Sequence, residues 1–549
     1  MSDRTLPDHP NLEQYKKQAK ELRRSVVAGT PAAIERIRRH HPRFRHPGSN
    51  SLRALSLADA QLVLAREHGY ESWPEFAKHI ETLRVIRTLG DLRDPIHTFL
   101  EVACVDRHGW HGSGTLEDAE MIRSRYPEVS TANIYSASVL GDAATVRAFL
   151  ERDGSLATAK GGPHGWDALT YVCFSRYLRI DKARSESFVD AARTLLEAGA
   201  NANTGWTEYI DTPPRPLHEA AIYGVAGLAQ HPGLTRLLLK YGADPNDEET
   251  PYHVAETYDN TVLQILLDSG RFSEASLATV AVRKCDWHDD KGLNLVLDHG
   301  VNPNYRTIWK FTPFQQSIRR DNGLVMIEAL LDHGADPLLP NLLDGRNAVQ
   351  MAAWYGRGDV LATLEDRGFE IRLEGLDSLV AVCARADLEG AWSRARQNPE
   401  LLTQLLQVGG TLLAHFAGAN NDAGVRCLLA LGVSSEALWP HGDGYWDLAP
   451  ASTALHVAAW RANHEVVKTL IAAGAPVNAG DARGRTALQL AVRACIDSYW
   501  KYRRKPDSVA ALLAAGARID GIDLPTGYSA IDELLVAQGK EDPGLNREF

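Results

Sequence analysis

A motif in the chain returns after 33 residues, and this spacing constrains the fold more than any other feature. Thr453-Ala454-Leu455-His456 is followed by Thr486-Ala487-Leu488-Gln489. The leading Thr can cap a helix, and the Leu and Ala residues after it give that helix an apolar face. A second apolar helix is predicted at residues 466–473, and Gly474 ends it. Neither short helix can bury its apolar stripe alone, so the spacing predicts a stack of helix pairs.

The same phase can be followed along most of the chain. Second-helix ends of the type Gly-Ala-Asp-Pro-Asn, as at residues 242–246, recur and give the same register independently. We therefore expect an all-α solenoid of about eleven repeats. The residues assigned to the position of His456 are Tyr135, Thr170, His218, His253, Ala278, Gln315, Gln350, Val380, His415, His456 and Gln489.

These motifs resemble the ankyrin repeat, whose pattern runs T-P-L-H-x-A-A and then V-V-x-x-L-L-x-x-G-A-D-x-N. The resemblance implies a curved stack of helix pairs that binds other macromolecules on its concave face. It also implies that His218, His253 and His456 tie neighbouring loops together by hydrogen bonds. The segments LPDHPNLEQYKKQAKELRR and SLADAQLVLAREHGYESWPEFAKHI resemble the helical segment at the N-terminus of bacterial ankyrin-repeat proteins.

Helical periodicity and capping signals divide the chain into four expected parts. Residues 1–90 are predicted to form a four-helix capping module, and residues 91–128 a degenerate repeat interrupted by a loop. The repeat array is expected over residues 129–520. Residues 521–549 are expected to form a half-repeat cap and a tail.

Composition limits the function classes. The net charge of −11 argues against a general nucleic-acid binder, although residues 1–50 are basic. The six cysteines are far apart and suggest neither a disulfide framework nor a metal site. We expect no signal peptide, no membrane span and a cytoplasmic location. No cofactor is expected, because no Walker, GxGxxG, HExxH, GxSxG or EF-hand motif occurs in a supporting context.

The variable positions after the Ala-Ala pair form the predicted contact surface. Aromatic and arginine side chains recur there, and these residue types bury a large area while keeping a polar group. The alternative is that such residues, the tryptophans above all, only fill gaps between stacked helices. The predicted binding residues are Trp166, Tyr223, Tyr258, Trp287, Arg319, Arg320, Trp354, Tyr355, Trp460 and Arg461.

Glu256 motivates an enzymatic alternative. It takes the place of the second Ala of its repeat, so we expect it to be partly buried and to pair with Arg283 or Lys284. Carboxylates interleaved with tryptophans and arginines would suit a carbohydrate or another small polar ligand, and paired acids could cleave a glycosidic bond. The catalytic candidates under this hypothesis are Glu256, Asp259, Asp286, Asp321 and His288.

Four stretches depart from the repeat pattern. Residues 176–179 are predicted to extend a first helix, and residues 205–209 to form a loop. The loop at residues 441–447 could cover the groove as a lid, or be a surface loop without function. Residues 498–505 could bind acids or RNA, or be the solvated end of a lengthened helix.

We expect the chain to act mainly as a scaffold for a protein partner. A carbohydrate or other small polar ligand is the alternative, and nucleic acid is not an expected partner. The two hypotheses differ in geometry, because a ligand site would close around carboxylates whereas a protein-binding face would be open and elongated.

Overall fold

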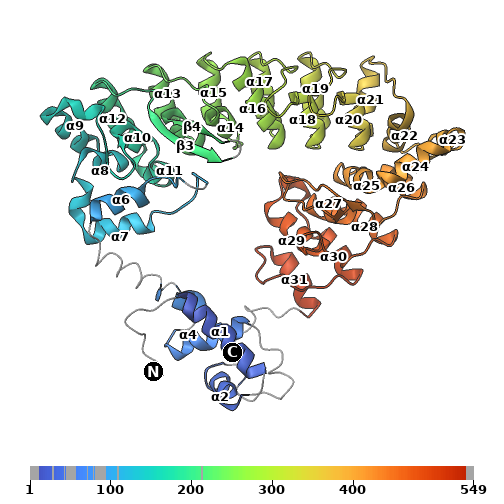
Figure 1. Ribbon diagram of the computed structural model, residues 1–549, viewed down its shortest axis with the longest axis horizontal. Helices are drawn as coiled ribbons and strands as arrows, with labels where there is room; N and C mark the ends of the chain where they lie inside the picture. Colours follow the sequence, from blue (N-terminus) through green and yellow to red (C-terminus); the bar gives the residue numbers. More distant parts are fainter. Residues whose placement is uncertain are drawn as a thin grey trace. The chain divides into compact units, whose positions relative to one another are not determined.

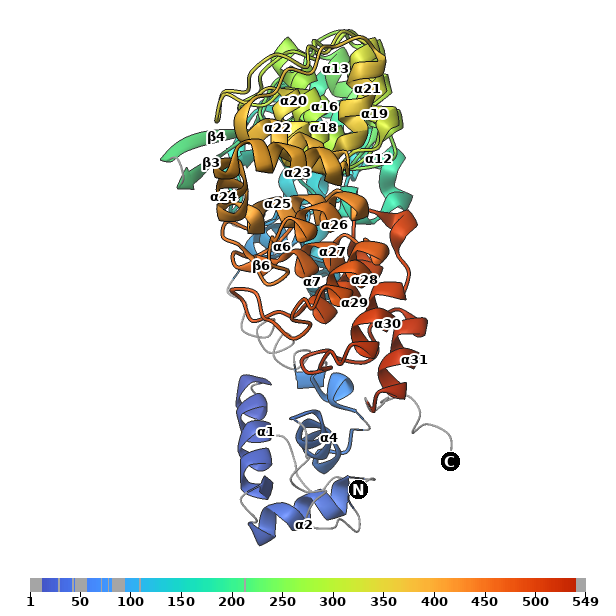
Figure 2. The ribbon, with the colours of Figure 1, turned by 90° about the vertical axis from the view of Figure 1, so that its right-hand side faces the viewer.

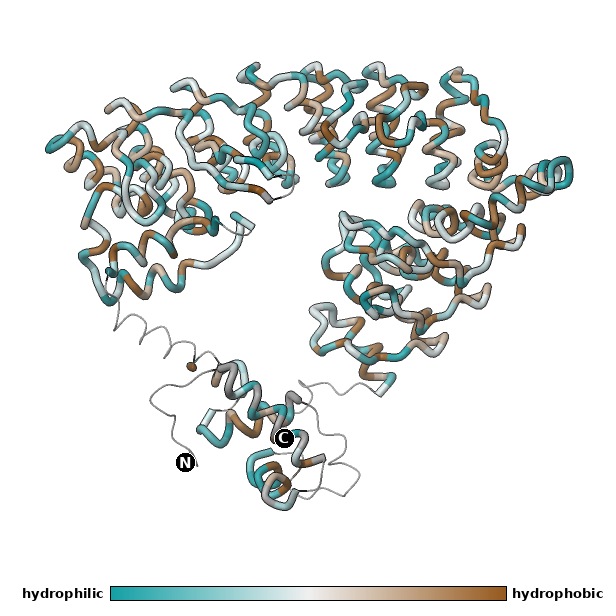
Figure 3. The backbone as a smooth tube through the Cα atoms, viewed as in Figure 1, coloured by the Kyte–Doolittle hydropathy of each residue, from teal (hydrophilic) through white to brown (hydrophobic). Residues whose placement is uncertain are grey.

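The structure, a computed structural model, describes residues 12–27, 30–41, 44, 57–70, 72–77, 79–80, 94–107, 110–211 and 214–539. The chain forms two compact units, Met1–Ala221 and Ile222–Phe549. Helices dominate both units, and the polypeptide alternates between short helices and connecting loops (Figure 1). Hydrophobic segments fall mainly within the helices, as the repeat pattern predicts (Figure 3).

The N-terminal helices of the first unit surround two small apolar clusters. One contains Ala19, Leu22 and Ile37, and the other contains Tyr15 and Phe76. The helices are α1 (Leu12–Val27), α2 (Pro31–His40) and α4 (Leu57–Glu67), followed by helical residues 73–77 and 79–80. The predicted end of the fourth helix near residue 83 and the predicted boundary at residue 90 lie outside the described residues.

The rest of the first unit contains a helical pair and the first repeats. Its helices are α6 (Pro95–Ala103), α7 (Glu117–Arg125), η2 (Pro127–Ser130), α8 (Ile134–Val139), α9 (Ala143–Arg152), η3 (Gly154–Ala157), α10 (Ala168–Cys173), α11 (Arg176–Ile180), η4 (Lys182–Arg184) and α12 (Ser185–Glu197). Its strands are β1 (Lys160–Gly161), β2 (Trp166–Asp167), β3 (Gly205–Asp211) and β4 (Pro214–Ala220).

Two predictions in this region were wrong. Residues 205–209 belong to strand β3, which pairs antiparallel with β4 to form an extended hairpin (Figure 2). His218 therefore lies in a strand opposite Thr207 instead of opening a helix, because the inserted residues take over the first turn of the repeat. Residues 176–179 do not extend the first helix either, because the hydroxyl of Ser175 caps a separate helix, α11.

The second unit stacks the remaining helix pairs. Its elements are η5 (Tyr223–Leu228), α13 (Pro232–Lys240), α14 (Glu249–His253), α15 (Thr261–Asp268), α16 (Glu274–Asp286), α17 (Asp290–Asp298), α18 (Pro313–Arg319), α19 (Leu324–Asp332), α20 (Ala348–Trp354), α21 (Gly358–Asp366), α22 (Gly375–Ala384), α23 (Leu388–Gln397), α24 (Pro399–Gln407), α25 (Gly409–Gly418), α26 (Asp422–Ala430), β5 (Leu438–Trp439), β6 (Ser452–Thr453), α27 (Ala454–Trp460), α28 (His464–Ala472), α29 (Ala487–Asp497), η6 (Lys501–Arg503), α30 (Asp507–Ala514) and α31 (Ser529–Ala537). Loops join consecutive pairs, and several of them are long, such as residues 299–312 between α17 and α18 (Figure 1).

Every residue assigned to the repeat position lies in a helix, except His218. His456 is the third residue of α27, and its counterparts in α10, α18, α20 and α29 are also third residues, whereas His253 is the last residue of α14. His456 shows why the motif recurs. Its Nδ1 lies 3.1 Å from the backbone N of Thr453, and its Nε2 lies 3.0 Å from the carbonyl oxygen of Ala479 and 3.1 Å from that of Arg485. It thus ties its own helix start to the next loop, as the resemblance implied. His253 does not, because both its ring nitrogens bond to carboxylates within its own repeat.

The turn between the two helices of a repeat needs a left-handed residue. Glycine supplies it at Gly141 and Gly356, with φ of 66° and 71°. His288 and Asp321 occupy the same position of the turn in their own repeats, with φ of 52° and 55°. In these two repeats a residue with a titratable side chain therefore adopts the left-handed conformation that glycine adopts at Gly141 and Gly356. Both turns lie beside the site described next.

Candidate functional site

Within the second unit, the inner turns of α16 and α18 meet two loops from later repeats. The guanidinium of Arg320 lies 3.9 Å from the ring centre of Tyr445 and 3.5 Å from a carboxylate oxygen of Asp443. Arg503 reaches Asp321 at 3.5 Å. We call these residues and their neighbours the inner cluster, which comprises Arg283, Asp286, His288, Arg320, Asp321, Arg357, Asp443, Tyr445, Trp446, Arg461, Trp500 and Arg503.

Asp286 is the central acceptor of the inner cluster. Helix α16 ends at this residue, so its carboxylate points away from the last turn toward the next repeat. It accepts hydrogen bonds from Nη1 of Arg283 at 2.5 Å, from Nε of Arg320 at 2.6 Å and from Nε2 of Gln316 at 2.6 Å. Asp286 is 3% exposed, so these charge-assisted bonds are shielded from water.

Glu256 has the partner that its position predicted. Its carboxylate pairs with Arg283 on one side and accepts a hydrogen bond from Nδ1 of His253 at 2.7 Å on the other. Burial alone would raise the pKa of Glu256, but the bonds from His253 and the charge of Arg283 hold it below its usual value. The predicted ion pair with Arg283 is confirmed, and Glu256 is a carboxylate at neutral pH.

His253 is a cation at neutral pH. Its two ring nitrogens donate to Glu249 at 2.9 Å and to Glu256 at 2.7 Å. Burial alone would lower the pKa of His253, but these two hydrogen bonds raise it to about 9.

This raised pKa predicts a pH-dependent contribution to stability. Because the folded-state pKa exceeds the ordinary value of 6.5, the contribution is complete below pH 6.5 and is lost as the pH rises through 9. We expect His253→Gln to lower the free energy of unfolding by about 2–3 kcal/mol at pH 6 and by much less at pH 10. Urea denaturation across this range measures the difference. His441→Gln, at an exposed position, is the control, and a difference that did not change with pH would contradict the assignment.

His288 is neutral and surrounded by cations. Burial, together with the charges of Arg461, Arg503, Arg320 and Arg357, lowers the pKa of His288 to about 3. The amide of Asn322 donates to its Nδ1 at 3.0 Å, so the proton of the neutral ring is on Nε2. Within the described residues, Nε2 has no hydrogen-bond partner.

Aromatic rings fix the two loops against the inner turns. Trp446 is 1% exposed and packs 4.9 Å from Trp500 and 4.7 Å from Tyr499, measured between ring centres. The ring of Trp500 lies 5.1 Å from that of His288. The prediction that residues 498–505 form the solvated end of a helix was wrong for Trp500, because α29 ends at Asp497 and the ring of Trp500 is buried.

Two cavities border the inner cluster. One, of about 230 Å³, has polar and aromatic walls that include Arg319, Tyr355, His415, Trp439 and Arg461. The other, of about 310 Å³, lies beside Tyr252, Arg283 and Trp309. The first is smaller than the roughly 300–1,000 Å³ of pockets for drug-sized ligands, and the second is at the lower limit of that range.

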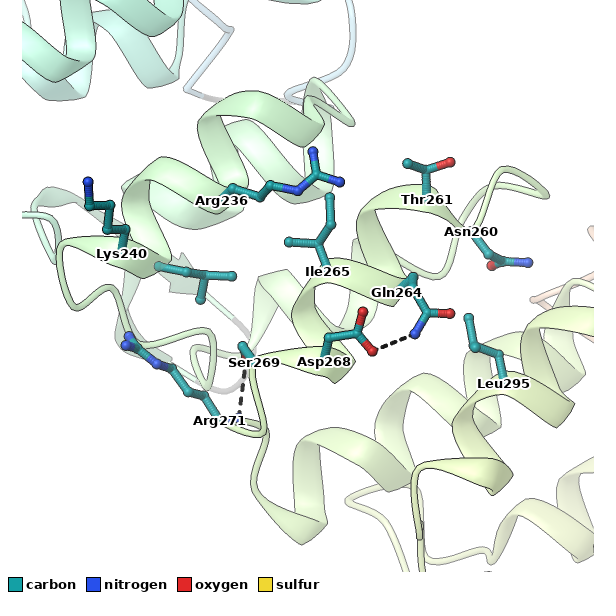
Figure 4. A pocket seen from close by; sticks show the side chains of 11 residues that line it. Arg236, Lys240, Asn260, Thr261, Gln264, Ile265, Asp268, Ser269, Arg271 and Leu295 are labelled. Carbon is teal, nitrogen blue, oxygen red and sulfur yellow. Dashed lines mark hydrogen bonds between the residues drawn. The ribbon is translucent and has the colours of Figure 1, made fainter.

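A larger groove of about 850 Å³ lies on the opposite, second-helix side of the array. Its walls come mainly from α13 and α15, with Arg236, Lys240 and Arg271 on one flank (Figure 4). Gln264 donates to Asp268 at 2.6 Å within it. The charged side chains of this groove are exposed to solvent, so the groove does not shield reacting groups from water as an active site would.

The structure brings most of the catalytic candidates together but not all of them. Glu256, Asp286, Asp321 and His288 all contact or belong to the inner cluster. Burial raises the pKa of Asp321, against the opposing charges of Arg357 and Arg503. Asp259 lies at the surface, where it caps the turn before Thr261. Catalysis by these groups stays a prediction.

The predicted binding residues are dispersed. In the first unit, Trp166 is buried with its ring 5.6 Å from that of Trp206. In the second unit, Arg320, Trp460 and Arg461 are buried and Tyr223 packs 5.3 Å from His253. The more accessible members are Tyr258, Trp287, Arg319, Trp354 and Tyr355. Their role in binding stays a prediction.

Several residues of the inner cluster were not among the predicted site residues. They are Arg283, Arg357, Asp443, Tyr445, Trp446, Trp500 and Arg503. The signal that could have found five of them was their position in residues 441–447 and 498–505, two stretches rich in aromatic and charged residues that depart from the repeat pattern.

Residues 415–523, which supply both loops of the inner cluster, match the family model for ankyrin repeats in three copies. This part of the chain is similar to ankyrin repeats. The chain is similar to ankyrin repeat and MYND domain-containing protein 1 of Homo sapiens, with 31% identity over 176 residues. That match covers 28% of this chain and 18% of the human protein.

Among solved structures, the chain matches the crystal structure of the human ASB11 ankyrin repeat domain. The sequence identity is 22% and the TM-score 0.20, over 43% of this chain and 98% of that chain. Among the described residues, no helix of the array or of the N-terminal module has the length and apolar character to span a membrane. Nor do His, Cys, Asp or Glu side chains in the described part gather in groups of three or more that could hold a metal ion.

Proposed function

We propose that the ankyrin array binds a protein partner, and that the loops at residues 304–311 and 338–346 form the contact surface. Ankyrin repeats are generally protein–protein interaction modules. The observation that supports this surface is its exposed apolar side chains. Ile308 is 79% exposed, Leu342 59% and Leu343 62%. Adjacent exposed apolar residues on a folded surface are typical of interaction sites.

The two loops are held in one frame. The backbone N of Leu342 donates to the carbonyl oxygen of Lys310 at 3.0 Å, and Nε of Arg306 donates to that of Pro340 at 2.9 Å. Because these hydrogen bonds already order the loops, little conformational entropy of the loops would be lost on binding, which favours affinity.

The inner positions of the array are less suited to a protein partner. Arg320, Trp460 and Arg461 occupy the places predicted for contacts, but side chains of the chain itself already bury them. A partner could reach Arg320 only by displacing Tyr445 and Trp446, whose rings lie 3.9 Å and 5.2 Å from its guanidinium. The loop tips need no such change.

Ile308→Asp combined with Leu342→Asp should weaken partner binding at least about tenfold, because two charges would replace the apolar centre of the contact. A photocrosslinking residue at position 343, where the parent Leu is 62% exposed, followed by identification of crosslinked proteins, provides the measurement in the parent and in each variant. Val325→Asp is the matched control, because Val325 is 61% exposed on the second helix α19. Retention of the same crosslinked proteins by the double variant would contradict the proposal.

A further inference from the structure

Arg461 is a buried cation without a carboxylate partner. It is 7% exposed and lines the cavity of about 230 Å³. Within the described residues, no carboxylate lies within ion-pair distance of its guanidinium, and its Nε has no hydrogen-bond acceptor. A buried charge without a counterion costs free energy, so its presence in a folded array calls for a compensating group.

The nearby carboxylates are already engaged by other arginines. Asp443 lies 3.5 Å from Arg320, and Asp321 lies 3.7 Å from Arg357 and 3.5 Å from Arg503. Both aspartates line the same cavity as Arg461. Their negative charges reduce the free-energy cost of burying the Arg461 cation, but neither aspartate forms an ion pair with it.

The fold makes room for this guanidinium. Residue 418 is glycine, and a Cβ atom there would lie 3.2 Å from Cζ and from Nη1 of Arg461. The rings of Trp446 and Trp500 lie 5.6 Å and 5.2 Å from the guanidinium on other sides. The side chain is therefore held in one place by its surroundings.

A second arginine at the cavity also lacks a carboxylate. Nη1 of Arg319 donates to the side-chain oxygen of Gln316 at 2.8 Å, and its guanidinium lies 4.2 Å from the ring centre of Phe311. No ion pair to Arg319 occurs among the described residues. Two arginines with donor capacity to spare thus border one small space.

His415, which also lines the cavity, offers a hydrogen-bond acceptor. Nδ1 of His415 donates to the carbonyl oxygen of Trp354 at 3.2 Å. Burial lowers the pKa of His415 to about 4, so the ring is neutral and its Nε2 is an acceptor. The ring stacks on Tyr355 with centres 4.4 Å apart, and Trp439 packs against its edge. Acceptors here suit the hydroxyl groups of a ligand.

We propose that this cavity binds a small hydroxylated organic anion, whose carboxylate or phosphate pairs with Arg461 and whose hydroxyls donate to His415, Asp321 and Asp443. The planar guanidinium presents parallel N–H donors that match the oxygens of either anionic group. The volume suits a compound of monosaccharide size or smaller. Loop 441–447 supplies one wall through Gly442, Asp443 and Gly444, so occupancy would also hold that loop in place.

This site is independent of the proposed protein-binding loops, and calorimetric titration of the full chain tests it. The probes are D-gluconate and D-glucose 6-phosphate, with D-glucose and inorganic phosphate as the neutral and the unhydroxylated comparison. We expect at least one of the two hydroxylated anions to bind and to raise the melting temperature. D-Glucose should not bind, and inorganic phosphate should bind at least tenfold more weakly than the hydroxylated anion does.

Arg461→Met is the decisive variant, and Arg372→Met, whose parent side chain is 80% exposed, is its matched control. We expect Arg461→Met to lose at least tenfold in affinity while its melting temperature without ligand stays the same or rises, because an unpaired buried charge is removed. Arg372→Met should bind as the parent does.

Four results of the titrations would overturn the proposal. They are no binding of either hydroxylated anion, equal binding of D-glucose, equal binding of inorganic phosphate, and unchanged affinity in Arg461→Met. If Arg461→Met unfolds or melts well below the parent, Arg461 stabilises the fold as a counterion of Asp321 and Asp443. That result also overturns the proposal.

Discussion

Replacing Asp286 by Ala should lower the free energy of unfolding of the second unit by about 3–5 kcal/mol, because it leaves buried arginines without their shared acceptor. Arg283 and Arg320 are 3% and 5% exposed, and both donate to this carboxylate. Arg283 would keep Glu256 and Arg320 would keep Asp443, so the loss should be large without abolishing folding. Urea denaturation followed by circular dichroism measures the shift.

The matched control is Asp366→Ala, which removes an exposed carboxylate at the end of α21 and should change stability by less than about 0.5 kcal/mol. Asp286→Asn should fall between the two, because the amide keeps one acceptor oxygen but loses the charge. Equal stabilities of Asp286→Ala and the control would show that the arginines find other partners and that Asp286 does not organise the inner cluster.

Trp446→Ala should cost about 3–5 kcal/mol and should also free the loop at residues 441–447. The ring of Trp446 is fully enclosed by Tyr445, Tyr499 and Trp500, and the guanidinium of Arg320 lies 5.2 Å from its centre. Removing it leaves a cavity where the loops meet α16 and α18. Limited proteolysis with a broad-specificity protease should then cut near residue 444 at least tenfold faster.

Trp110→Ala is the matched control, because Trp110 is 70% exposed and its removal leaves no internal cavity. We expect parent-like stability and cleavage in the second unit from that variant. If Trp446→Ala were destabilised without faster cleavage near residue 444, the ring would fill space without anchoring the loop.

The sequence predicts the repeats well because their signals are local. Thr453 with His456, and Thr486 with Gln489, bring a cap and its reciprocal partner within one helical turn, so the period can be recognised from adjacent residues. The signal fails where an insertion replaces that turn. At His218 the histidine stands at the right spacing, but the hairpin of β3 and β4 has taken the place of the helix start.

Only some contacts of the inner cluster could be predicted from the sequence, because only those between consecutive repeats follow the repeat pattern. The ion pair of Glu256 and Arg283 could be predicted from sequence, because the two residues occupy neighbouring positions of the repeat pattern in consecutive repeats. No period connects Arg320 to Tyr445 or Asp321 to Arg503, since those contacts arise where loops of distant repeats meet. The aromatic content of residues 441–447 and 498–505 marked them as unusual without indicating what they touch.

The closure of the second unit upon itself also changes how its folding should proceed. A simple solenoid has only neighbour-to-neighbour interfaces, so its end repeats can fray one at a time. Here the hydroxyl of Tyr445 lies 3.5 Å from Nη1 of Arg283, 162 residues earlier in the chain. Because the two residues are far apart in sequence, bringing them together costs conformational entropy of the intervening chain. The contact stabilises the fold only after this cost has been offset. The intervening repeats should therefore form before the contact does, and once it is made they should unfold together instead of unzipping from the C-terminal end.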